Sequence, residues 1–490
     1  MMDKSFNFGN FTVSRRGIHE VHDVVLINPP ISQMDRYGKL APLGNHLPNL
    51  GLAYLAAYLR QNGVTVSILD AAALGYSIEK TARMTAEKLP LIAGLTATTM
   101  SVGRAAALAS KIKQYSPDTM IVLGGPHITG APVETMETYR SIDYGVLGEG
   151  ELTVQELFQK LKAGEPPEEV DGLIFRHKGK LVRTRPRALI PDLDRLPMPA
   201  WDLLPDLAVH YRPSPQSILR LPSSILCTSR GCPYRCAFCD RSVFGNVYRG
   251  HSPQRIYDMM ALLSTGYGIR DISFHDEMFF VSEKNLVELC QLIRRNDLDI
   301  TWSCQTRANL TPSDFSLRLM KEAGCWQLQF GLESGSNEML RRMQKDLSVE
   351  DYQQAIARTS AAGIRTKAFI MLGYPGETED TLAETEKFVL ESDLNDIMIG
   401  FFTPYPGIEA RQDLERHGTI VGGYEKQSAH FVSFVPNGLS QDALVKARNH
   451  IYRRFYLRPK VIRSAMSRLR EPSARPLLLD AARKFWGATR

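Results

Sequence analysis

The chain has 490 residues, 43% hydrophobic and 23% charged, which is enough to bury the cores of about two to four ordinary domains. Its formal net charge of +6 is small for this length and gives no indication of a nucleic-acid partner. Residues 1–22 lack the apolar core of a signal peptide, and no run of about 18 apolar residues predicts a spanning helix, so we expect a cytoplasmic protein.

The first third of the chain alternates short apolar runs with helical patterns. Runs of 4–6 residues rich in Val, Ile and Leu are typical of strands buried on both faces. Strand–helix alternation at this spacing predicts parallel strands joined by crossover helices. We therefore expect an α/β fold over residues 20–165, a Rossmann-like, doubly wound parallel sheet with strands at 24–27, 64–69, 91–95, 120–123 and 144–147.

Residues 166–217 contain many prolines, which fix φ and remove a backbone donor. This composition predicts a proline-rich linker, with a small hairpin formed by residues 172–175 and 180–184.

Strand–helix alternation resumes over residues 218–440. Six units are recognisable, with strands expected at 224–228, 272–275, 300–304, 327–332, 366–372 and 397–402. Because eight units would close a full barrel, six predict a partial (β/α)6 barrel.

The last segment, residues 441–490, has a helical pattern and is basic. From Lys446 onward it carries 13 Lys or Arg against two acidic residues, Glu471 and Asp480. A solvated helical face explains this charge, and peripheral contact with an anionic membrane is the alternative.

Cysteines are concentrated in one place. None of the seven precedes Cys227, and Cys232, Cys236 and Cys239 form a C-x3-C-x2-C pattern directly after a predicted strand. Closely spaced thiolates are the usual ligands of iron–sulfur clusters. Three ligands leave one iron with an open position, as a catalytic metal requires.

Other interpretations of these cysteines are weaker. A zinc site usually shows two C-x2-C pairs or a Cys/His set, and the nearest histidine, His251, is 12 residues beyond Cys239. A disulfide scaffold would distribute an even number of cysteines through a short chain. Unconnected buried cysteines are the remaining alternative.

This pattern, with Phe238 just before its last cysteine and after the first strand of a half-open barrel, resembles the radical S-adenosylmethionine superfamily. The resemblance implies a 4Fe-4S cluster on Cys232, Cys236 and Cys239. It also implies that the open iron chelates the amino and carboxylate groups of S-adenosylmethionine, which is cleaved to a 5′-deoxyadenosyl radical.

The same resemblance implies S-adenosylmethionine-binding residues at the carboxyl ends of the barrel strands. Helix capping is the alternative role for Asp276 and Glu277, and a simple loop is the alternative for residues 373–377. The residues implied are Phe238, Asp276, Glu277, Gln305, Arg307, Glu333 and Ser334.

A Rossmann-like domain ahead of such a barrel resembles the cobalamin-binding class of this superfamily. The Asp-x-His-x-x-Gly signature that supplies a histidine to cobalt is absent, and His127 has a turn histidine as its alternative role. Methylthiotransferases carry three further cysteines in their first domain, which this chain lacks. The resemblance implies cobalamin-binding residues Asn45, Thr96, Thr98, Thr99, Gly124, Gly125, Pro126, His127, Glu149 and Gly150.

The expected activity is that of a cobalamin-dependent radical C-methyltransferase acting on an unactivated carbon. A non-methylating relative, of the anaerobic magnesium-protoporphyrin ester cyclase or ring-contracting type, has the same layout, and the motifs do not separate the two. A cobalamin- or metal-binding regulatory module is the alternative from another class. The expected partners are a small-molecule, lipid-like or tetrapyrrole substrate and an external flavodoxin- or ferredoxin-like electron donor, with no nucleic acid.

Overall fold

The structure, a computed structural model, describes residues 11–14, 17–20 and 22–488, and the chain divides into two compact units. The first unit takes the described residues up to Ile31 together with residues 49–188 and 197–204. The second takes residues 32–48, 189–196 and 205 to the C-terminal end. Short segments from the first half of the chain therefore fold with the second unit.

The first unit is built on a seven-stranded sheet of order β4-β3-β5-β6-β7-β8-β9. Strands β3 to β7 are parallel to their neighbours, as expected from their apolar runs. Strands β8 and β9 add an antiparallel hairpin at one edge. The strands are Val24–Asn28 (β3), Val66–Asp70 (β4), Ile92–Thr96 (β5), Met120–Gly124 (β6), Tyr144–Val146 (β7), Leu173–His177 (β8) and Lys180–Arg183 (β9).

Helices flank this sheet as the doubly wound prediction requires. Helix α2 packs against α7, and α3 packs against α4. Val24 and Leu26 of β3 join Leu157 of α7 in one aliphatic core, from which water is excluded. The helices are Leu50–Gln61 (α2), Ile78–Glu87 (α3), Val102–Tyr115 (α4), Pro126–Gly130 (α5), Pro132–Thr138 (α6) and Glu151–Ala163 (α7); a separate pair, β1 (Phe11–Ser14) and β2 (Gly17–Glu20), precedes them.

The proline-rich segment 166–217 has more structure than a linker pattern indicates. The hairpin expected within it is present and extends the seven-stranded sheet as β8 and β9. Residues 189–196 and 205–217 belong to the second unit. The segment therefore contributes to both units, because its prolines interrupt helices without preventing strand edges or extended coverings.

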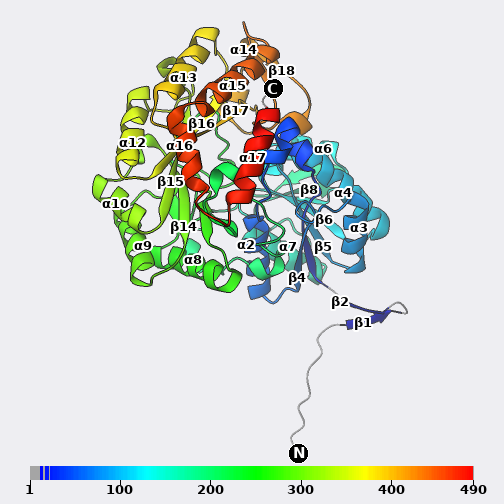
Figure 1. Ribbon diagram of the computed structural model, residues 1–490. Helices are drawn as coiled ribbons and strands as arrows, with labels where there is room; N and C mark the ends of the chain where they lie inside the picture. The colour runs from blue at the N-terminus through cyan, green and yellow to red at the C-terminus, as the bar shows by residue number, and fades with distance from the viewer. Residues whose placement is uncertain (1–10, 15–16, 21, 489–490) are drawn as a thin grey trace, which may run out of the picture. The chain divides into compact units, whose positions relative to one another are not determined.

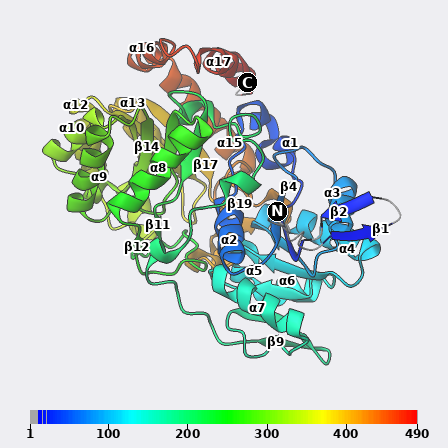
Figure 2. The ribbon, with the colours of Figure 1, turned by 90° about the horizontal axis from the view of Figure 1, so that it is seen from below.

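The second unit is built on a six-stranded, all-parallel sheet of order β10-β13-β14-β15-β16-β17, which confirms the expected partial barrel. In Figures 1 and 2 helices α8, α9, α10, α12 and α13 lie along the outer side of this curved sheet. The strands are Ser223–Leu226 (β10), Asp271–Phe274 (β13), Thr301–Thr306 (β14), Cys325–Glu333 (β15), Arg365–Leu372 (β16) and Asp396–Phe401 (β17).

The crossover helices begin at hydroxyl N-caps, whose oxygen accepts an otherwise unpaired backbone N–H. The N-caps are Ser252, Ser282, Ser313, Ser348 and Thr378. The helices are Pro253–Tyr267 (α8), Glu283–Arg295 (α9), Asp314–Glu322 (α10), Asn337–Arg342 (α11), Val349–Ala361 (α12) and Glu379–Glu391 (α13).

The basic C-terminal segment folds as helices of the second unit, as expected. Part of its charge is used inside the unit: Arg468 is buried and donates to the carbonyls of Pro215 and Ile218, and Arg458 donates to the carbonyls of Val389 and Ser392. The helices are Gln441–Tyr456 (α15), Pro459–Arg468 (α16) and Arg475–Ala488 (α17).

Smaller elements complete the second unit. They are α1 (Gln33–Tyr37), α14 (Leu414–His417), and the strand pairs β11 (Ser229–Arg230) with β12 (Arg249–Gly250) and β18 (Gly418–Ile420) with β19 (Phe434–Pro436). Within the part of the chain that the structure describes, no helix is both long and apolar enough to cross a membrane.

Candidate functional site

The three cysteines of the C-x3-C-x2-C pattern lie in a loop that follows β10. The short strands β11 and β12 pair across the base of this loop and close it. Gly231 stands at its entrance with φ +83°, and a Cβ there would come within 2.3 Å of the Val247 carbonyl oxygen. Glycine is therefore required for the chain to turn into the loop.

Contacts from several elements fix the loop over the barrel. The Ala237 N–H donates to the carbonyl of Met343 at 3.0 Å, and the Ala237 carbonyl accepts from the Ala410 N–H at 2.9 Å. Phe238 packs against an apolar cluster that includes Phe402 and Phe434. Because these anchors flank the cysteines, the spacing of the thiols is set by the surrounding fold.

The three thiols share one environment. Cys232, Cys236 and Cys239 interact electrostatically with one another, Cys236 is buried and the other two are half-buried. Burial raises the pKa of Cys232, and it raises that of Cys239 to about 12. Metal coordination deprotonates such thiols because the cation replaces the missing hydration.

The donor set of this loop is three thiols, as a cubane with one open iron would use. Among the described residues, no three His, Cys, Asp or Glu side chains converge as a mononuclear metal site requires. A cubane does not need such convergence, because each thiolate binds a different iron. The loop also offers three thiols rather than four, which leaves one iron for an external ligand.

Arg307, expected near S-adenosylmethionine, lies directly against the cysteine loop. Its guanidinium donates to Cys236 Sγ at 3.4 Å and to the Lys345 carbonyl, and it stacks over the Tyr234 ring at 3.6 Å. Hydrogen bonds to a metal-binding sulfur orient the ligand and tune its basicity. Arg307 is thus placed to position Cys236.

Asp276 and Glu277 follow β13 and have different surroundings. Asp276 is buried, and its Oδ1 accepts from the backbone N–H groups of Thr228 and Ser229, both at 2.6 Å, while Oδ2 has no hydrogen-bond partner. Glu277 is exposed and interacts electrostatically with Cys232. Burial raises the pKa of Asp276 to about 7. Part of the Glu277 side chain is accessible to solvent, but its carboxyl is largely desolvated and is repelled by Asp240, and its pKa is also raised to about 7. Asp276 thus holds the strand end, whereas Glu277 is available to a ligand.

Glu333 ends β15 in a strained conformation. Its φ is +66°, unusual for a residue with a side chain, and the pairing of β15 with β16 shifts register there. Its Oε1 lies 3.0 Å from the Lys345 Nζ in a buried ion pair. The neighbouring Ser334 is fully buried, and its hydroxyl bonds to Thr385 Oγ1 and the Ser336 N–H. Strain of this kind is typical of functional sites.

Gln305 and the loop after β16 complete the carboxyl ends of the strands. Gln305 is half-buried at the end of β14. In the loop, buried Glu377 accepts from the Gly373 N–H, and burial raises the pKa of Glu377 to about 8. The bonding within residues 373–377 is that of a self-capped turn.

In the first unit, the residues expected to bind cobalamin gather where β5, β6 and β7 end. The strand order reverses at β3, and open α/β sheets bind ligands at the carboxyl ends next to such a reversal. Gly124 has open space around its missing Cβ, whereas Gly125 has φ +98° and closely approaches Thr96 Oγ1. The two glycines therefore leave the backbone of this edge uncovered by side chains at Gly124 and tightly packed at Gly125. The residues found there are Thr96, Thr98, Thr99, Gly124, Gly125, Pro126, His127, Glu149 and Gly150.

His127 is buried beneath this edge. Its Nδ1 lies 3.3 Å from Thr99 Oγ1, and the His127 N–H donates to the Ala97 carbonyl. Thr98 is exposed and exchanges capping bonds with Ser101. The buried imidazole is placed to support the edge rather than to project beyond it.

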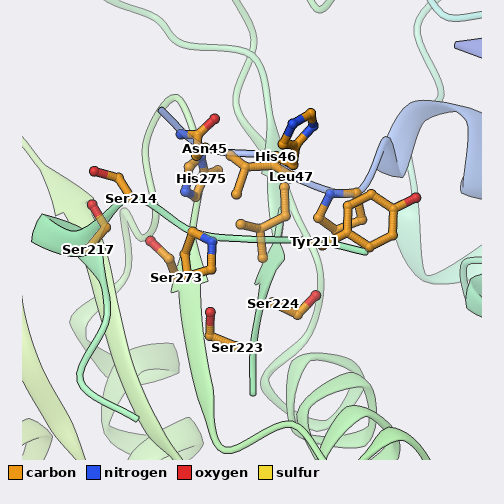
Figure 3. Close-up of a pocket in the computed structure, with 13 residues that line it drawn as sticks. Asn45, His46, Leu47, Tyr211, Ser214, Ser217, Ser223, Ser224, Ser273 and His275 are labelled. Atoms are coloured by element: carbon orange, nitrogen blue, oxygen red, sulfur yellow. The ribbon is translucent and has the colours of Figure 1, made fainter. Parts of the chain in front are cut away.

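Asn45 is distant from this group in the sequence and lies in the other compact unit. It belongs to the second unit and lines a cavity with Ser217 and His275 (Figure 3). Its Oδ1 accepts from the Tyr37 hydroxyl at 2.6 Å.

Two lysines of the site carry no sequence signal that would single them out. Lys345 pairs with Glu333, and Lys367 is buried inside the barrel with its Nζ 3.0 Å from Ser217 Oγ. Each is a single lysine in an ordinary context, and only the fold shows that it is buried.

Comparison with known proteins agrees with this geometry. Residues 226–389 match the radical SAM superfamily, and residues 39–158 match the B12 binding domain. A chain of Pyrococcus horikoshii described as an uncharacterized methyltransferase is 31% identical over 445 residues, covering 90% of this chain and 94% of that one. The anaerobic magnesium-protoporphyrin IX monomethyl ester cyclase of Rubrivivax gelatinosus is 28% identical, covering 85% of this chain and 75% of that one.

A solved structure has the same fold. The cobalamin-dependent S-adenosylmethionine radical enzyme OxsB, with aqua-cobalamin and S-adenosylmethionine bound, aligns with a TM-score of 0.65 at 22% identity. The alignment covers 76% of this chain and 52% of OxsB, so the chain spans about half the length of that protein. Together with the two matched domains and the Pyrococcus relative, these findings show that the chain belongs to the cobalamin-binding class of radical S-adenosylmethionine enzymes.

Proposed function

We propose that this enzyme is a C-methyltransferase that transfers a methyl group to an unactivated carbon of a small molecule. The observation that carries the proposal is the anchored loop of Cys232, Cys236 and Cys239 over a six-stranded barrel, in a chain that also has a B12 binding domain. The Pyrococcus relative, named a methyltransferase, aligns over 94% of its length. This coverage supports the same reaction class here.

In this proposal the three cysteines hold the 4Fe-4S cluster, and the cluster supplies the electron that cleaves S-adenosylmethionine. Arg307 positions Cys236 through its contact with Sγ and stiffens the loop by stacking over Tyr234. Such outer contacts are worth about 10–100-fold in metal affinity or activity.

We further propose that the residues at the barrel's carboxyl ends bind S-adenosylmethionine in two ways. Glu277, Gln305 and Glu333 would contact it directly, since each has a side chain that is not fully buried. Phe238, Asp276, Arg307 and Ser334 would shape the site, because their polar atoms or rings are largely engaged by the protein. In the first of these two sets, the acidic side chains of Glu277 and Glu333 suit the positively charged amine of S-adenosylmethionine.

For cobalamin we propose the strand ends of the first unit as the binding edge. Gly124 and Gly125 would allow the backbone to approach the corrin face, and the hydroxyls of Thr96, Thr98 and Thr99 would line it. Asn45 belongs to the second unit and is not part of this edge. We propose 20–165, 166–217, 218–440 and 441–490 as the working boundaries of the domains, the linker and the C-terminal segment.

The second candidate reaction is non-methylating cyclisation, supported by the 28% identity to the Rubrivivax cyclase. The two reactions differ in a product that can be measured. Methyl transfer consumes one S-adenosylmethionine as methyl donor and yields S-adenosylhomocysteine, whereas cyclisation yields only 5′-deoxyadenosine.

Anaerobic reconstitution of the full chain tests the proposal. We expect about four irons and four sulfides per chain, uptake of hydroxocobalamin, and both 5′-deoxyadenosine and S-adenosylhomocysteine with S-adenosylmethionine and dithionite. Substituting Cys232, Cys236 and Cys239 together by alanine should abolish iron uptake, while alanine at Cys290, a buried cysteine of α9, should not. Unchanged iron uptake in the triple variant would refute the cluster assignment.

Partners follow from the same proposal. A flavodoxin- or ferredoxin-like donor would supply the electron in a cytoplasmic setting. Peripheral membrane contact is proposed for the surface where Leu457, Ile462 and Met466 are exposed on or next to the basic helices α15 and α16. Co-sedimentation with anionic vesicles tests this contact, and binding equal to that of neutral vesicles would contradict an electrostatic contribution.

A further inference from the structure

A small cavity lies along the free edge of the barrel, entirely within the second unit. Strand β10 is the edge strand, and two extended segments, residues 45–48 and 211–217, cover it. These segments pair with each other through two backbone hydrogen bonds between His46 and Arg212. The free space inside holds about two water molecules.

The two ends of this cavity differ in chemistry. Figure 3 shows Ser214, Ser217, Ser273 and His275 at one end and the Tyr211 ring at the other. None of the thirteen lining residues is acidic. The polar end therefore offers hydroxyl, amide and imidazole groups with no negative charge to repel an anion.

The hydrogen-bonding state of Asn45 and His275 makes this end a donor surface. Asn45 Oδ1 already accepts from the Tyr37 hydroxyl at 2.6 Å, which leaves its Nδ2 hydrogens for another acceptor. Burial lowers the pKa of His275 to about 4, so its imidazole is neutral at pH 7 and its ring N–H remains available. Both groups can therefore donate to a ligand without adding charge of their own.

A buried ammonium stands directly behind the polar end. Lys367 is 3% exposed, and its Nζ donates to Ser217 Oγ at 3.0 Å. Among the described residues no carboxylate lies within 4.0 Å of it, because Asp396 is paired with Arg365 at 2.8 Å. Asp396 attracts this ammonium at longer range, and the Phe369 ring lies 4.9 Å from it, yet burial still lowers the pKa of Lys367 to about 8. A buried ammonium with no carboxylate in direct contact favours an anion placed close to it.

Ser217 connects this ammonium to the cavity. Since its oxygen accepts from Lys367, its own hydrogen is free to donate to a group inside the cavity. An anion placed there would receive a hydrogen bond from a hydroxyl polarised by a positive charge.

We propose that this cavity binds a carboxylate group of the substrate. The space of about two waters matches the two oxygens of a carboxylate and is too small for a tetrahedral phosphate. His275 immediately precedes Asp276 and Glu277, so the bound group lies at the same end of β13 as the proposed S-adenosylmethionine site. The inference deepens the proposed function and rests on it for the identity of the ligand as substrate.

Binding of a small carboxylate can be measured without turnover. We would record 19F relaxation of fluoroacetate with the full-length protein at constant ionic strength, using fluoroacetamide as the neutral probe of equal size. Broadening of fluoroacetate alone, reversed by acetate and not by acetamide, is the expected result. Equal broadening of both probes would show binding without preference for a carboxylate, and no broadening would show that the cavity holds only water; either result would overturn the inference.

Two variants assign the binding to this cavity. Lys367→Met keeps the length of the side chain and should weaken fluoroacetate binding at least about tenfold, as loss of a charged partner predicts. Lys284→Met, at an exposed position of α9, should leave binding unchanged. Equal affinity in Lys367→Met and wild type would refute the site.

A third variant guards against misfolding of Lys367→Met. Ser214→Val keeps the lysine and fills the polar end, so it should also abolish broadening while circular dichroism and melting temperature stay near wild type. Failure of the proposed function would appear separately, as absence of 5′-deoxyadenosine in the holoenzyme. A protein that forms 5′-deoxyadenosine but binds no carboxylate would retain the function and lose this inference.

Discussion

The two large sheets of this protein bury different kinds of side chain. In the first unit β3 reads Val-Val-Leu-Ile-Asn and is buried through its apolar part, and its one polar residue, Asn28, ends the strand. In the second unit one face of the sheet is apolar, with Ile272 and Phe274, whereas alternate positions carry Asp271 and Ser273. Ligand chemistry is therefore confined to an edge in the first sheet but continues into the interior in the second.

The polar face of the six-stranded sheet is held together by hydrogen bonds between neighbouring strands. Ser303 Oγ lies 3.2 Å from Ser273 Oγ and accepts from Gln329 Nε2 at 3.3 Å. A packed eight-stranded barrel fills this space with branched aliphatic residues. Here buried polar side chains, Ser273, Ser303 and Gln329, take the place of aliphatic ones.

The largest effect on the cluster and on activity is expected where the polar interior meets the cysteine loop. Arg307→Met removes the contact with Cys236 Sγ and the stacking on Tyr234, so cluster affinity or 5′-deoxyadenosine formation should fall about 10–100-fold. Arg307→Lys keeps the charge but lacks the planar guanidinium, so its cluster affinity and 5′-deoxyadenosine formation should lie between those of Arg307→Met and wild type. Iron content after desalting and the electron paramagnetic resonance spectrum of the reduced cluster report the change.

Arg318→Met, at an exposed position of α10, is the matched control. If Arg307→Met leaves both the spectrum and the iron content unchanged, the positioning role is wrong.

The buried pair of Glu333 and Lys345 tests whether the second sheet tolerates unpaired charge. Lys345→Met leaves Glu333 without its partner and should lower the free energy of unfolding by about 3–5 kcal/mol. Adding Glu333→Gln should recover much of that loss, because the remaining charge is removed. Denaturant titration followed by the fluorescence of Trp302 and Trp326, both buried in this sheet, measures the difference.

An equal loss in the single and double variants would show that lost packing, rather than unpaired charge, causes the destabilisation.

The first sheet should respond through its backbone. Gly125→Ala places a methyl group at φ +98°, within 2.8 Å of Thr96 Oγ1, and should cost about 1–3 kcal/mol together with weaker hydroxocobalamin uptake. Iron uptake by the second unit should not change. Gly124→Ala, where the added group meets nothing within 4 Å, is the control for stability.

If both alanine variants lose cobalamin equally, close approach of the ligand rather than backbone strain explains the glycine pair.

The contrast between apolar and polar interiors also separates what the sequence could predict from what it could not. The strands of both sheets were predictable because their buried runs, such as residues 92–96 and 397–401, are apolar and bounded by turn residues. The cysteine loop was predictable because its ligands are local in sequence. The grouping of Asn45 with the second unit was not, because it depends on contacts with residues far along the chain.

The buried lysines show the physical reason most clearly. Lys367 alternates with apolar neighbours as any exposed lysine of a strand would, and its burial depends on covering segments from residues 211–217. These covering residues belong to a proline-rich stretch whose composition indicates a linker. Local patterns thus predict the apolar sheet and its edges, but not which polar side chains the fold encloses.

The last effect concerns pH and the turn after β16. Burial raises the pKa of Glu377 to about 8 from an ordinary 4.5, so between these values the folded protein keeps a proton that the unfolded chain has released. Stability should therefore fall as pH rises through this window. Glu377→Gln removes the titration while an amide oxygen can still accept from the Gly373 N–H, so its stability should exceed that of wild type increasingly toward pH 8.

Exposed Glu379→Gln, two residues on, should follow the wild-type profile in the same melting experiment. A Glu377→Gln profile parallel to wild type would show that unfolding does not change the protonation of the Glu377 carboxyl. The polar turn would then add no pH dependence to stability, as is expected of the apolar sheet of the first unit.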